Sequence, residues 1–419
     1  MSGKELDYVK KAFEGNWVVP LGPDVDAFEK SLENFVDTNT EGTSVSNSKV
    51  VALSSGTAAL HLALVGCNVG LGDEVLVQSF TFCASSNPVT YLGATPVFID
   101  SERETWNMDP ELLAIAIEDR VVKTGKKPKA IIPVALYGMP YQIEKIKEVA
   151  ERYEIPLIED AAEGFGSRYK GRVLGTFGKF GVLSFNGNKM ITTSGGGALI
   201  CRDEKAKNEL MFYATQARES YPYYQHEKIG YNYRMSNICA AIGRGQMTIL
   251  EEHIAHHKYV QKRYCELLQD VQGIKMHQAP VLSSEGDDLK GTFDSNYWLC
   301  TALLDPSLKI RGQENAYKSI VKGAVGGASG VTHVATSSHT EHEPNANVEA
   351  LRIALDQANI EARPLWKPMH LQPVYKKNPA YVNGVSESLF KVGICLPSGP
   401  WVTDTHIDYI VSIIKNSIL

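Results

Sequence analysis

Short apolar runs alternate with amphipathic stretches through the first half of the chain. Several runs are apolar at every position, as expected for strands that are covered on both faces. The predicted strands are Val50–Leu53, Glu74–Gln78, Pro96–Asp100, Ala130–Leu136, Ile155–Asp160, Val182–Phe185 and Ala198–Cys201. Helical segments such as Thr57–Val65 and Ile143–Tyr153 separate them. This alternation predicts an α/β fold with a central, mostly parallel sheet between layers of helices.

The pattern changes near Met247. Gln246–Leu268 is predicted to form one long helix, and Trp401–Leu419 an amphipathic helix at the end of the chain. We therefore expect a large domain over residues 1–249 and a smaller α/β domain over residues 250–419. Polar stretches that are expected to form loops are Glu41–Ser48, Ser283–Gly291 and Gly323–Asn347.

Composition and charge exclude several classes of protein. The 42 Lys and Arg residues against 48 Asp and Glu give a net charge of −6, which argues against a nucleic-acid binder. No apolar run approaches the roughly 18 residues of a membrane span, and the first residues lack the pattern of a secretory signal. The seven cysteines form no C-x-x-C pair, so neither a zinc site nor a disulfide framework is expected. A cytoplasmic protein fits these features best.

The segment Ser54–Leu60 is the first candidate for chemistry. Small residues end a predicted strand here and a helix begins. Free backbone N–H groups and hydroxyls therefore lie at the positive end of the helix dipole. Such a turn suits a phosphate group. An ordinary N-cap formed by Ser or Thr explains the same residues.

Asp160 is the second candidate, because it stands at the carboxyl end of an apolar strand. Open α/β sheets bind ligands at this edge. A carboxylate in that place is costly unless it meets a cation or a hydrogen-bond donor, and a protonated heterocyclic nitrogen is one such partner. The alternative is that Asp160 caps a following helix.

Lys189 is the third candidate, and lies in a loop among small and polar residues. A lysine that forms a Schiff base needs a confined position, whereas most lysines are solvated. The run Gly195-Gly196-Gly197 follows without the spacing of a nucleotide P-loop. A phosphate turn, an acid at a strand end and a loop lysine, in this order on one sheet, are the groups that pyridoxal phosphate requires.

Five motifs resemble one enzyme family. They are Ser55-Gly56-Thr57-Ala58-Ala59-Leu60, Ser79-Phe80-Thr81-Phe82, Glu159-Asp160-Ala161-Ala162-Glu163, Ser184-Phe185 with Lys189, and Gly230-Tyr231-Asn232-Tyr233-Arg234-Met235. Together they resemble the sugar-nucleotide aminotransferases of the DegT/DnrJ/StrS kind, which are fold-type I pyridoxal phosphate enzymes. The resemblance runs from about residue 7 to the end of the chain. It implies a large domain with a central sheet, a smaller C-terminal α/β domain, and pyridoxal phosphate as cofactor.

The resemblance also implies a role for each matching residue. Lys189 corresponds to the Schiff-base lysine and Asp160 to the acid that faces the pyridine nitrogen. Glu163 stands where the family commonly has His or Gln near the cofactor hydroxyl, and Phe82 matches the aromatic ring that stacks on the cofactor. The remaining matches are the phosphate-binding residues Gly56, Thr57 and Ser184, and Asn232, which reaches the cofactor phosphate of a neighbouring subunit.

Asn232 therefore implies a homodimer with active sites shared across the interface. Arg234 is a candidate for binding an anionic donor or the sugar nucleotide, and Trp366, Lys367 and His370 are candidates for the nucleotide-sugar pocket. Glutamate is the amino donor that the resemblance implies.

Two segments most resemble the bacillosamine branch of the family, namely residues 186–197 and 362–370. That branch aminates C4 of a UDP-linked 4-keto-6-deoxy-N-acetylhexosamine. Alternatives are an aminotransferase for a GDP- or dTDP-linked keto sugar, or a non-catalytic sugar-nucleotide binder or regulator on the same fold. A related dehydratase branch carries His in place of the lysine, so Lys189 argues against it.

His253 and His257 share the predicted long helix at the i, i+4 spacing of a metal-binding pair. No third ligand accompanies them in the sequence, so a solvated helix face is the preferred explanation and no metal is expected.

Overall fold

The computed structural model describes residues 1–39, 41–44, 47–280, 292–317, 325–326, 332–333 and 343–419. Its contacts divide the chain into two compact units. Unit 1 consists of Met1–Lys258, Ala279–Trp298 and Pro368–Ser386, and unit 2 of Tyr259–Gln278, Leu299–Lys367 and Glu387–Leu419. These bounds differ from the expected division at residue 250, because two later segments return to unit 1.

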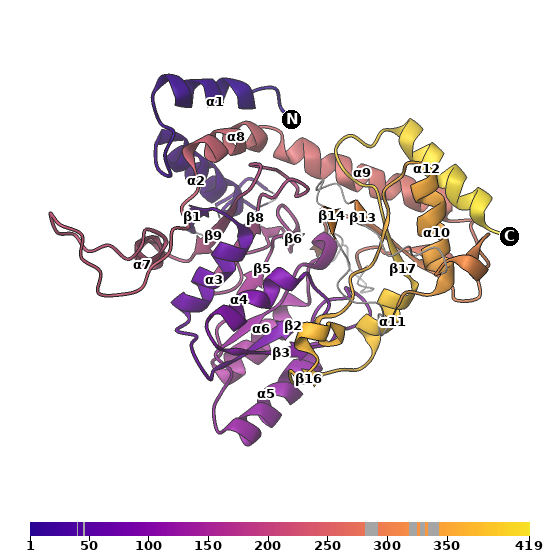
Figure 1. The fold of residues 1–419 in the computed structure, drawn as a ribbon, viewed down its shortest axis with the longest axis horizontal. Helices are drawn as coiled ribbons and strands as arrows, with labels where there is room; N and C mark the ends of the chain where they lie inside the picture. Colours follow the sequence, from indigo (N-terminus) through magenta and orange to yellow (C-terminus); the bar gives the residue numbers. More distant parts are fainter. Residues whose placement is uncertain (40, 45–46, 281–291, 318–324, 327–331, 334–342) are drawn as a thin grey trace. The chain divides into compact units, whose positions relative to one another are not determined.

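The sheet of unit 1 is mostly parallel, as the alternation of elements predicted (Figure 1). One four-stranded part has the order β16-β3-β2-β4, with every neighbouring pair parallel. The other has the order β1-β9-β8-β5, in which β9 is antiparallel to both of its neighbours. Parallel bridges join Ile131 to Leu157 and Val134 to Asp160, which place β5 beside β4. The strands are β1 (Lys49–Leu53), β2 (Glu74–Gln78), β3 (Thr95–Ile99), β4 (Ala130–Ile132), β5 (Ile158–Asp160), β8 (Phe180–Ser184), β9 (Gly197–Cys201) and β16 (Ala380–Tyr381).

Alternate residues of these strands pack into two separate apolar cores. In β1, Val50 and Ala52 join one core while Val51 and Leu53 join the other, and every one of these side chains is fully buried. Because successive side chains of a strand point to opposite faces, helices cover both faces of the sheet. The α/β fold with a helix-covered sheet is thereby confirmed.

Helices of unit 1 surround this sheet. They are α1 (Glu5–Glu14), α2 (Pro23–Val36), α3 (Gly56–Gly66), α4 (Asn87–Tyr91), α5 (Pro110–Thr124), α6 (Ile143–Tyr153), α7 (Glu204–Ala214) and α8 (Asn237–Met247), and α9 (Leu250–Leu268) begins here. Three short strands, β6 (Arg168–Tyr169), β7 (Arg172–Val173) and β11 (Phe293–Asp294), form a small separate sheet.

The single long helix expected over Gln246–Leu268 is wrong in one respect, because the helix is interrupted. α8 ends at Met247, and the Thr248 hydroxyl donates to the backbone oxygen of Gly245 at 2.7 Å. A hydroxyl that bonds to the preceding turn competes with the helical hydrogen bonds at this position. α9 then begins at Leu250.

Unit 2 packs helices against an antiparallel sheet of order β10-β12-β17-β15. Its core includes Tyr264 of α9, Leu351 of α10 and Ile407 of α12. Its elements are the end of α9, β10 (Ile274–Met276), β12 (Cys300–Leu304), the strand pair β13 (Val325–Gly326) and β14 (Thr332–His333), α10 (Ala346–Gln357), β15 (Arg363–Pro364), the end of α11 (Val385–Val392), β17 (Gly393–Leu396) and α12 (Asp404–Ser417). The predicted C-terminal helix is α12, and the smaller α/β unit is confirmed.

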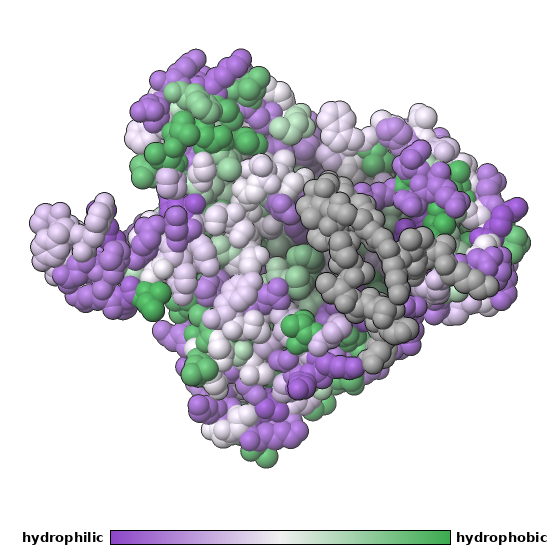
Figure 2. All heavy atoms as spheres, viewed as in Figure 1, coloured by the Kyte–Doolittle hydropathy of each residue, from purple (hydrophilic) through white to green (hydrophobic). Residues whose placement is uncertain are grey.

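Most of the expected loop 323–347 lies outside the described residues, apart from the strand pair β13–β14 and residues 343–347. All of 283–291 lies outside them as well. Across the described ranges, no helix combines the length and the apolar character needed to cross a membrane. Exposed apolar side chains gather over α1 and the turn that follows it (Figure 2). This N-terminal patch consists of Leu6, Phe13, Trp17, Val18, Val19 and Leu21.

Candidate functional site

The turn between β1 and α3 brings together the residues expected to bind phosphate. Ser55 is the N-cap of α3, and its hydroxyl accepts a hydrogen bond from the Ala58 N–H at 3.0 Å. A Cβ added to Gly56 would lie 3.0 Å from Cβ of Ser184 at the end of β8, and one added to Gly197 would clash with the backbone of Ser55 and Gly56. Because Gly56 and Gly197 have no side chains, Ser184 can lie beside the free N–H groups of the first helical turn.

Asp160 ends β5 as a buried carboxylate, 7% exposed. Ser85 donates its hydroxyl proton to Oδ2 at 2.6 Å, and the Ala162 N–H donates to Oδ1 at 3.2 Å. No helix begins in the fully described segment 161–203, so Asp160 is not a helix cap there. Burial raises the pKa of Asp160, against the opposing influence of Ser85, Ala162 and the Lys189 charge. A cation at this carboxylate would therefore be strongly favoured.

Lys189 and Glu163 form an ion pair, and these two residues with the side chains that contact them are called the lysine pocket. The Lys189 side chain is 13% exposed, and its Nζ lies 3.6 Å from Oε1 of Glu163. Oε2 of Glu163 accepts a hydrogen bond from the Tyr137 N–H at 2.7 Å. Burial raises the pKa of Glu163 to about 7, and the Lys189 charge opposes that rise. Lys189 is thus a confined amine beside a carboxyl group, not a solvated surface lysine.

The Glu163 carboxyl gives a prediction for the cofactor-free protein. Because its folded pKa is raised, the stability linked to its proton is present below about pH 4.5 and is lost as pH rises through about 7. The free energy of unfolding should therefore fall by roughly 3 kcal/mol between these pH values, since one pKa unit corresponds to about 1.4 kcal/mol. Glu163→Gln is expected to remove this decline. Denaturant unfolding at both ends of the range measures it. Glu227→Gln, an exposed control, should keep the decline, and an unchanged decline in Glu163→Gln contradicts the prediction.

Two residues in this pocket were missed by the sequence analysis. Trp298 places its ring against Lys189, with Nζ 3.9 Å from the ring centroid. Asn296, which is fully buried, donates from Nδ2 to the backbone oxygen of Glu163 at 2.9 Å. Both follow β11, more than a hundred positions after the lysine, and no local motif links them to it.

Phe82 and Asn232, the other expected cofactor residues, are both exposed. Phe82 directly precedes the short 3-10 helix Cys83–Ser85, which carries the Asp160 partner Ser85, and its side chain is 54% exposed. Asn232 is exposed and forms a backbone bridge with Thr215. Arg234 is committed to Glu29, with Nη1 to Oε1 at 2.9 Å. An anionic substrate would have to compete with this ion pair, so the structure gives no support to the substrate-binding role expected of Arg234.

The remaining candidates fall in different units. His370 belongs to unit 1, where its Nδ1 lies 2.6 Å from the Ser79 hydroxyl oxygen, in the segment that leads to Phe82. Trp366 and Lys367 are half-buried and belong to unit 2, directly after β15. Their roles in a nucleotide-sugar pocket stay predictions.

The expectation of a solvated face for His253 and His257 is wrong. His257 is 3% exposed, and its Nδ1 lies 3.2 Å from the Tyr297 backbone oxygen. His253 Nδ1 lies 3.1 Å from the backbone oxygen of Met190, next to the lysine. This face of α9 therefore packs against the segments that carry Lys189 and Trp298. Within the described ranges, no three His, Cys, Asp or Glu side chains are grouped to hold a metal ion.

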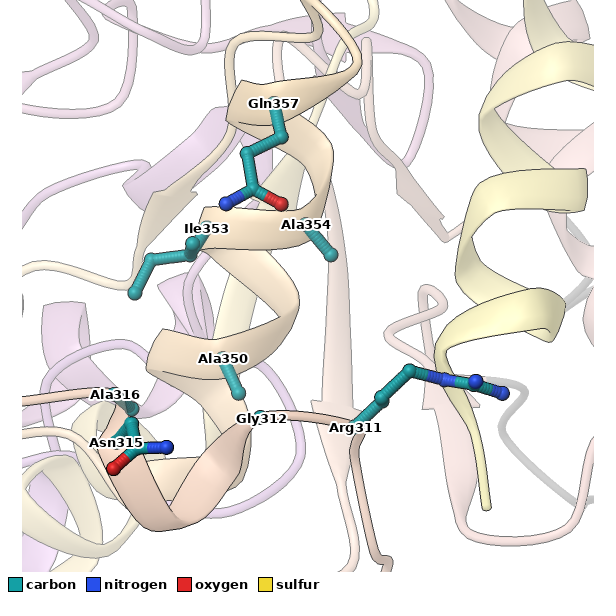
Figure 3. Close-up of a pocket in the computed structure, with 8 residues that line it drawn as sticks. All are labelled: Arg311, Gly312, Asn315, Ala316, Ala350, Ile353, Ala354 and Gln357. Carbon is teal, nitrogen blue, oxygen red and sulfur yellow. The ribbon is translucent and has the colours of Figure 1, made fainter.

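A hollow of about 390 Å³ lies on unit 2 (Figure 3). Its floor is formed by Ala350, Ile353 and Ala354 of α10, and Arg311 extends away from that helix. None of the candidate residues of unit 1 lines it. It is therefore a separate feature from the lysine pocket.

The lysine pocket fits pyridoxal phosphate in its donor set. The turn at Gly56 offers N–H groups and the Ser184 hydroxyl to a phosphate, and buried Asp160 suits a protonated ring nitrogen. Lys189 supplies an amine to an aldehyde, and its charge lowers the pKa of Asp160 against the effect of burial.

Proteins of known family resemble this chain over nearly its whole length. The sequence profile of the DegT/DnrJ/EryC1/StrS aminotransferase family matches residues 1–309 and 311–415. The protein EpsN of Bacillus subtilis (strain 168) is 40% identical over 99% of this chain and 93% of its own length. A GDP-perosamine synthase of Escherichia coli O157:H7 is 33% identical over 98% of this chain and 94% of its own. A crystal structure of a DegT DnrJ EryC1 StrS aminotransferase from Brucella abortus superimposes with a TM-score of 0.80 at 26% identity, covering 99% of this chain and 95% of that one.

Proposed function

Because the chain belongs to the DegT/DnrJ/EryC1/StrS aminotransferase family, we propose that it moves an amino group from glutamate to C4 of a UDP-linked 4-keto-6-deoxy sugar. Membership makes the protein a pyridoxal phosphate-dependent sugar aminotransferase. The observation that carries the proposal is the confined Lys189 amine, which lies 3.6 Å from Glu163 and within electrostatic range of the buried Asp160 carboxylate.

The cofactor supplies an aldehyde that takes up the amino group and a protonated ring that accepts electron density. The chain's own groups do the rest. Gly56, Thr57 and Ser184 bind the phosphate, and Phe82 contacts the ring. Asp160, oriented by Ser85, keeps the ring nitrogen protonated through a charge-assisted hydrogen bond. Nζ of Lys189 removes the proton from Cα of the donor amino acid and later returns one to the sugar carbon.

The UDP-linked substrate is supported by two segments of sequence. Residues 186–197 surround Lys189, and residues 362–370 lead from β15 to His370. Both resemble the bacillosamine branch, which suggests UDP-2-acetamido-4-keto-2,4,6-trideoxyhexose as the acceptor. One specific observation favours a second candidate. The GDP-perosamine synthase that matches nearly the whole chain makes a GDP-linked keto sugar the alternative.

A substrate comparison separates these candidates. Purified holoenzyme is incubated with glutamate and UDP-, GDP- or dTDP-linked 4-keto sugars, and 2-oxoglutarate and product mass are followed. We expect kcat/KM for the UDP compound to exceed the others by at least about tenfold, since one favourable pocket contact gives that much discrimination. A preference for the GDP compound would establish the second candidate instead. No turnover of any keto sugar by the glutamate-loaded enzyme would refute both.

We also propose a homodimer. Asn232 is exposed, and the N-terminal patch presents apolar surface of the kind that marks subunit interfaces. The exposed tyrosines Tyr221, Tyr223 and Tyr224 lie between Thr215 and Asn232 and add aromatic surface. In a dimer whose sites are shared, the Asn232 side chain of each subunit completes the phosphate site of the other.

Hybrid dimers test the shared site. Lys189→Ala and Asn232→Ala homodimers are each expected to be nearly inactive. After subunit exchange, half of the dimers are hybrids with one intact site, so about a quarter of the wild-type activity should return. Mixing Lys189→Ala with a second lysine-deficient variant, Lys189→Met, is the matched control and should restore nothing. If the first mixture also restores nothing although mass photometry shows hybrids, the Asn232 role is wrong.

A further inference from the structure

The Lys189 amine is in contact with two groups of the protein. Its Nζ lies 3.6 Å from Oε1 of Glu163 and 3.9 Å from the centroid of the Trp298 ring. The amine therefore faces a buried carboxyl group and an aromatic surface, and the proposed mechanism assigns a role to neither Glu163 nor Trp298.

Trp298 is fixed by two hydrogen bonds. Its indole N–H donates to the backbone oxygen of Asn188 at 2.7 Å, and its backbone N–H donates to Oδ1 of Asn296 at 2.9 Å. The residue is 3% exposed. Because Asn188 directly precedes the lysine, the indole ring is tied to the same turn as the amine that it faces.

Asn296 connects the backbone of Trp298 to the backbone of Glu163. Its Nδ2 donates to the backbone oxygens of Glu163 and Phe165, both at 2.9 Å. The neighbouring backbone leaves no spare room, because a Cβ added to Gly138 would clash with Oδ1 of Asn296. One buried amide thus joins the backbones of the two residues whose side chains contact the lysine, as expected of a preorganised site.

We propose that the indole face of Trp298 holds the protonated Lys189 amine whenever that amine is not joined to the cofactor. An ammonium group within about 6 Å of a tryptophan face is attracted by the ring quadrupole, and the attraction grows when both groups are withheld from water. Asp160 and Glu163, whose carboxyl groups lie within electrostatic range of the same amine, add to this attraction. The inference rests on the proposed role of Lys189.

Holding the amine has a consequence for turnover. Over a full cycle, the Lys189 amine would be released once, when the donor amine takes its place on the cofactor, and would return to the cofactor only after the sugar has been aminated. An amine that stays over the ring keeps its place beside the reacting atoms, whereas a solvated lysine would have to be recaptured. Trp298 thereby shortens the path of a group that the reaction releases and uses again.

The test measures the reactivity of Lys189 in the cofactor-free protein. Trp298→Leu removes the aromatic face, and acylation by an N-hydroxysuccinimide ester is quantified by peptide mass spectrometry, with exposed Lys205 as the internal standard. At about pH 7 the Lys189 rate should rise about threefold to tenfold, because the protonated form has lost its partner. At a pH well above the ordinary lysine pKa the rise should nearly vanish, because the ring quadrupole does not attract a neutral amine. A rise of equal size at both pH values, which reports better access alone, overturns the proposal, as does an unchanged rate.

Two further variants complete the experiment. Trp298→Phe keeps a weaker aromatic face and should give a smaller rise, of about twofold, with the same pH dependence. It decides the question if Trp298→Leu does not fold, and an unchanged Lys189 rate in it then overturns the proposal. Trp401→Leu, at a side chain that is 75% exposed, should match the wild type.

Covalent uptake of pyridoxal phosphate separates this inference from the proposed function. It is measured after borohydride reduction in the wild type and in Trp298→Leu. Attachment at Lys189 together with unchanged acylation overturns the inference alone. Attachment at a different lysine of the wild type refutes both the proposed role of Lys189 and the inference that rests on it.

Discussion

Lys189→Ala is expected to lower transamination by at least about 10⁴-fold, the upper end of what one positioned acid–base group contributes. The variant loses the amine that holds the cofactor covalently and the base that moves the proton. Glutamate-dependent formation of 2-oxoglutarate measures the loss, and the absorbance of the bound cofactor reports whether the covalent link is gone.

The matched control is Lys205→Ala, because Lys205 is an exposed lysine on α7. It should keep the wild-type rate and the wild-type absorbance. Turnover by Lys189→Ala at a rate near that of the wild type would falsify the assignment of the lysine.

Asp160→Asn is expected to bind the cofactor yet lower turnover by about 10²- to 10³-fold, a typical loss when one preorganised electrostatic group is removed. An amide cannot stabilise a protonated ring nitrogen as a carboxylate does. The amide oxygen can still accept from Ser85, while the Ala162 N–H loses its acceptor, so the cofactor should still bind at the cost of one hydrogen bond. Single-turnover spectra with glutamate separate slow proton transfer from weak binding.

Asp270→Asn serves as the control for this substitution, since Asp270 is exposed and belongs to unit 2. Its kinetics should not change. The electron-accepting role of the ring, as supported by Asp160, would be untenable if Asp160→Asn turned over as fast as this control.

Much of the fold follows from local pattern. The predicted strand Glu74–Gln78 has the same bounds as β2. Its three central residues are apolar and buried, as expected for a strand that is covered on both faces, and polar residues mark its two ends. The strand predicted over Ala130–Leu136 was too long, since β4 ends at Ile132. Pro133 follows without an N–H for the ladder, and Tyr137 adopts a positive φ of 54°.

The candidate site was predictable as far as its motifs are local. Gly56, Asp160 and Lys189 each stand in a short segment whose residue types indicate their chemistry. Trp298 and Asn296 were missed because nothing in their own segment points to a lysine more than a hundred positions earlier. His257 was misjudged for the same reason, since its burial depends on Tyr297, which lies in a segment distant in sequence.

The return of segment 279–298 to unit 1 has a consequence for recombination among relatives. A crossover at residue 249, the boundary that the sequence suggests, would take Lys189 from one parent and Trp298 and Asn296 from the other. Chimeras of that design inherit a mismatched lysine pocket even when both halves fold. Exchanges that keep the segment 279–298 with the N-terminal part should preserve activity more often.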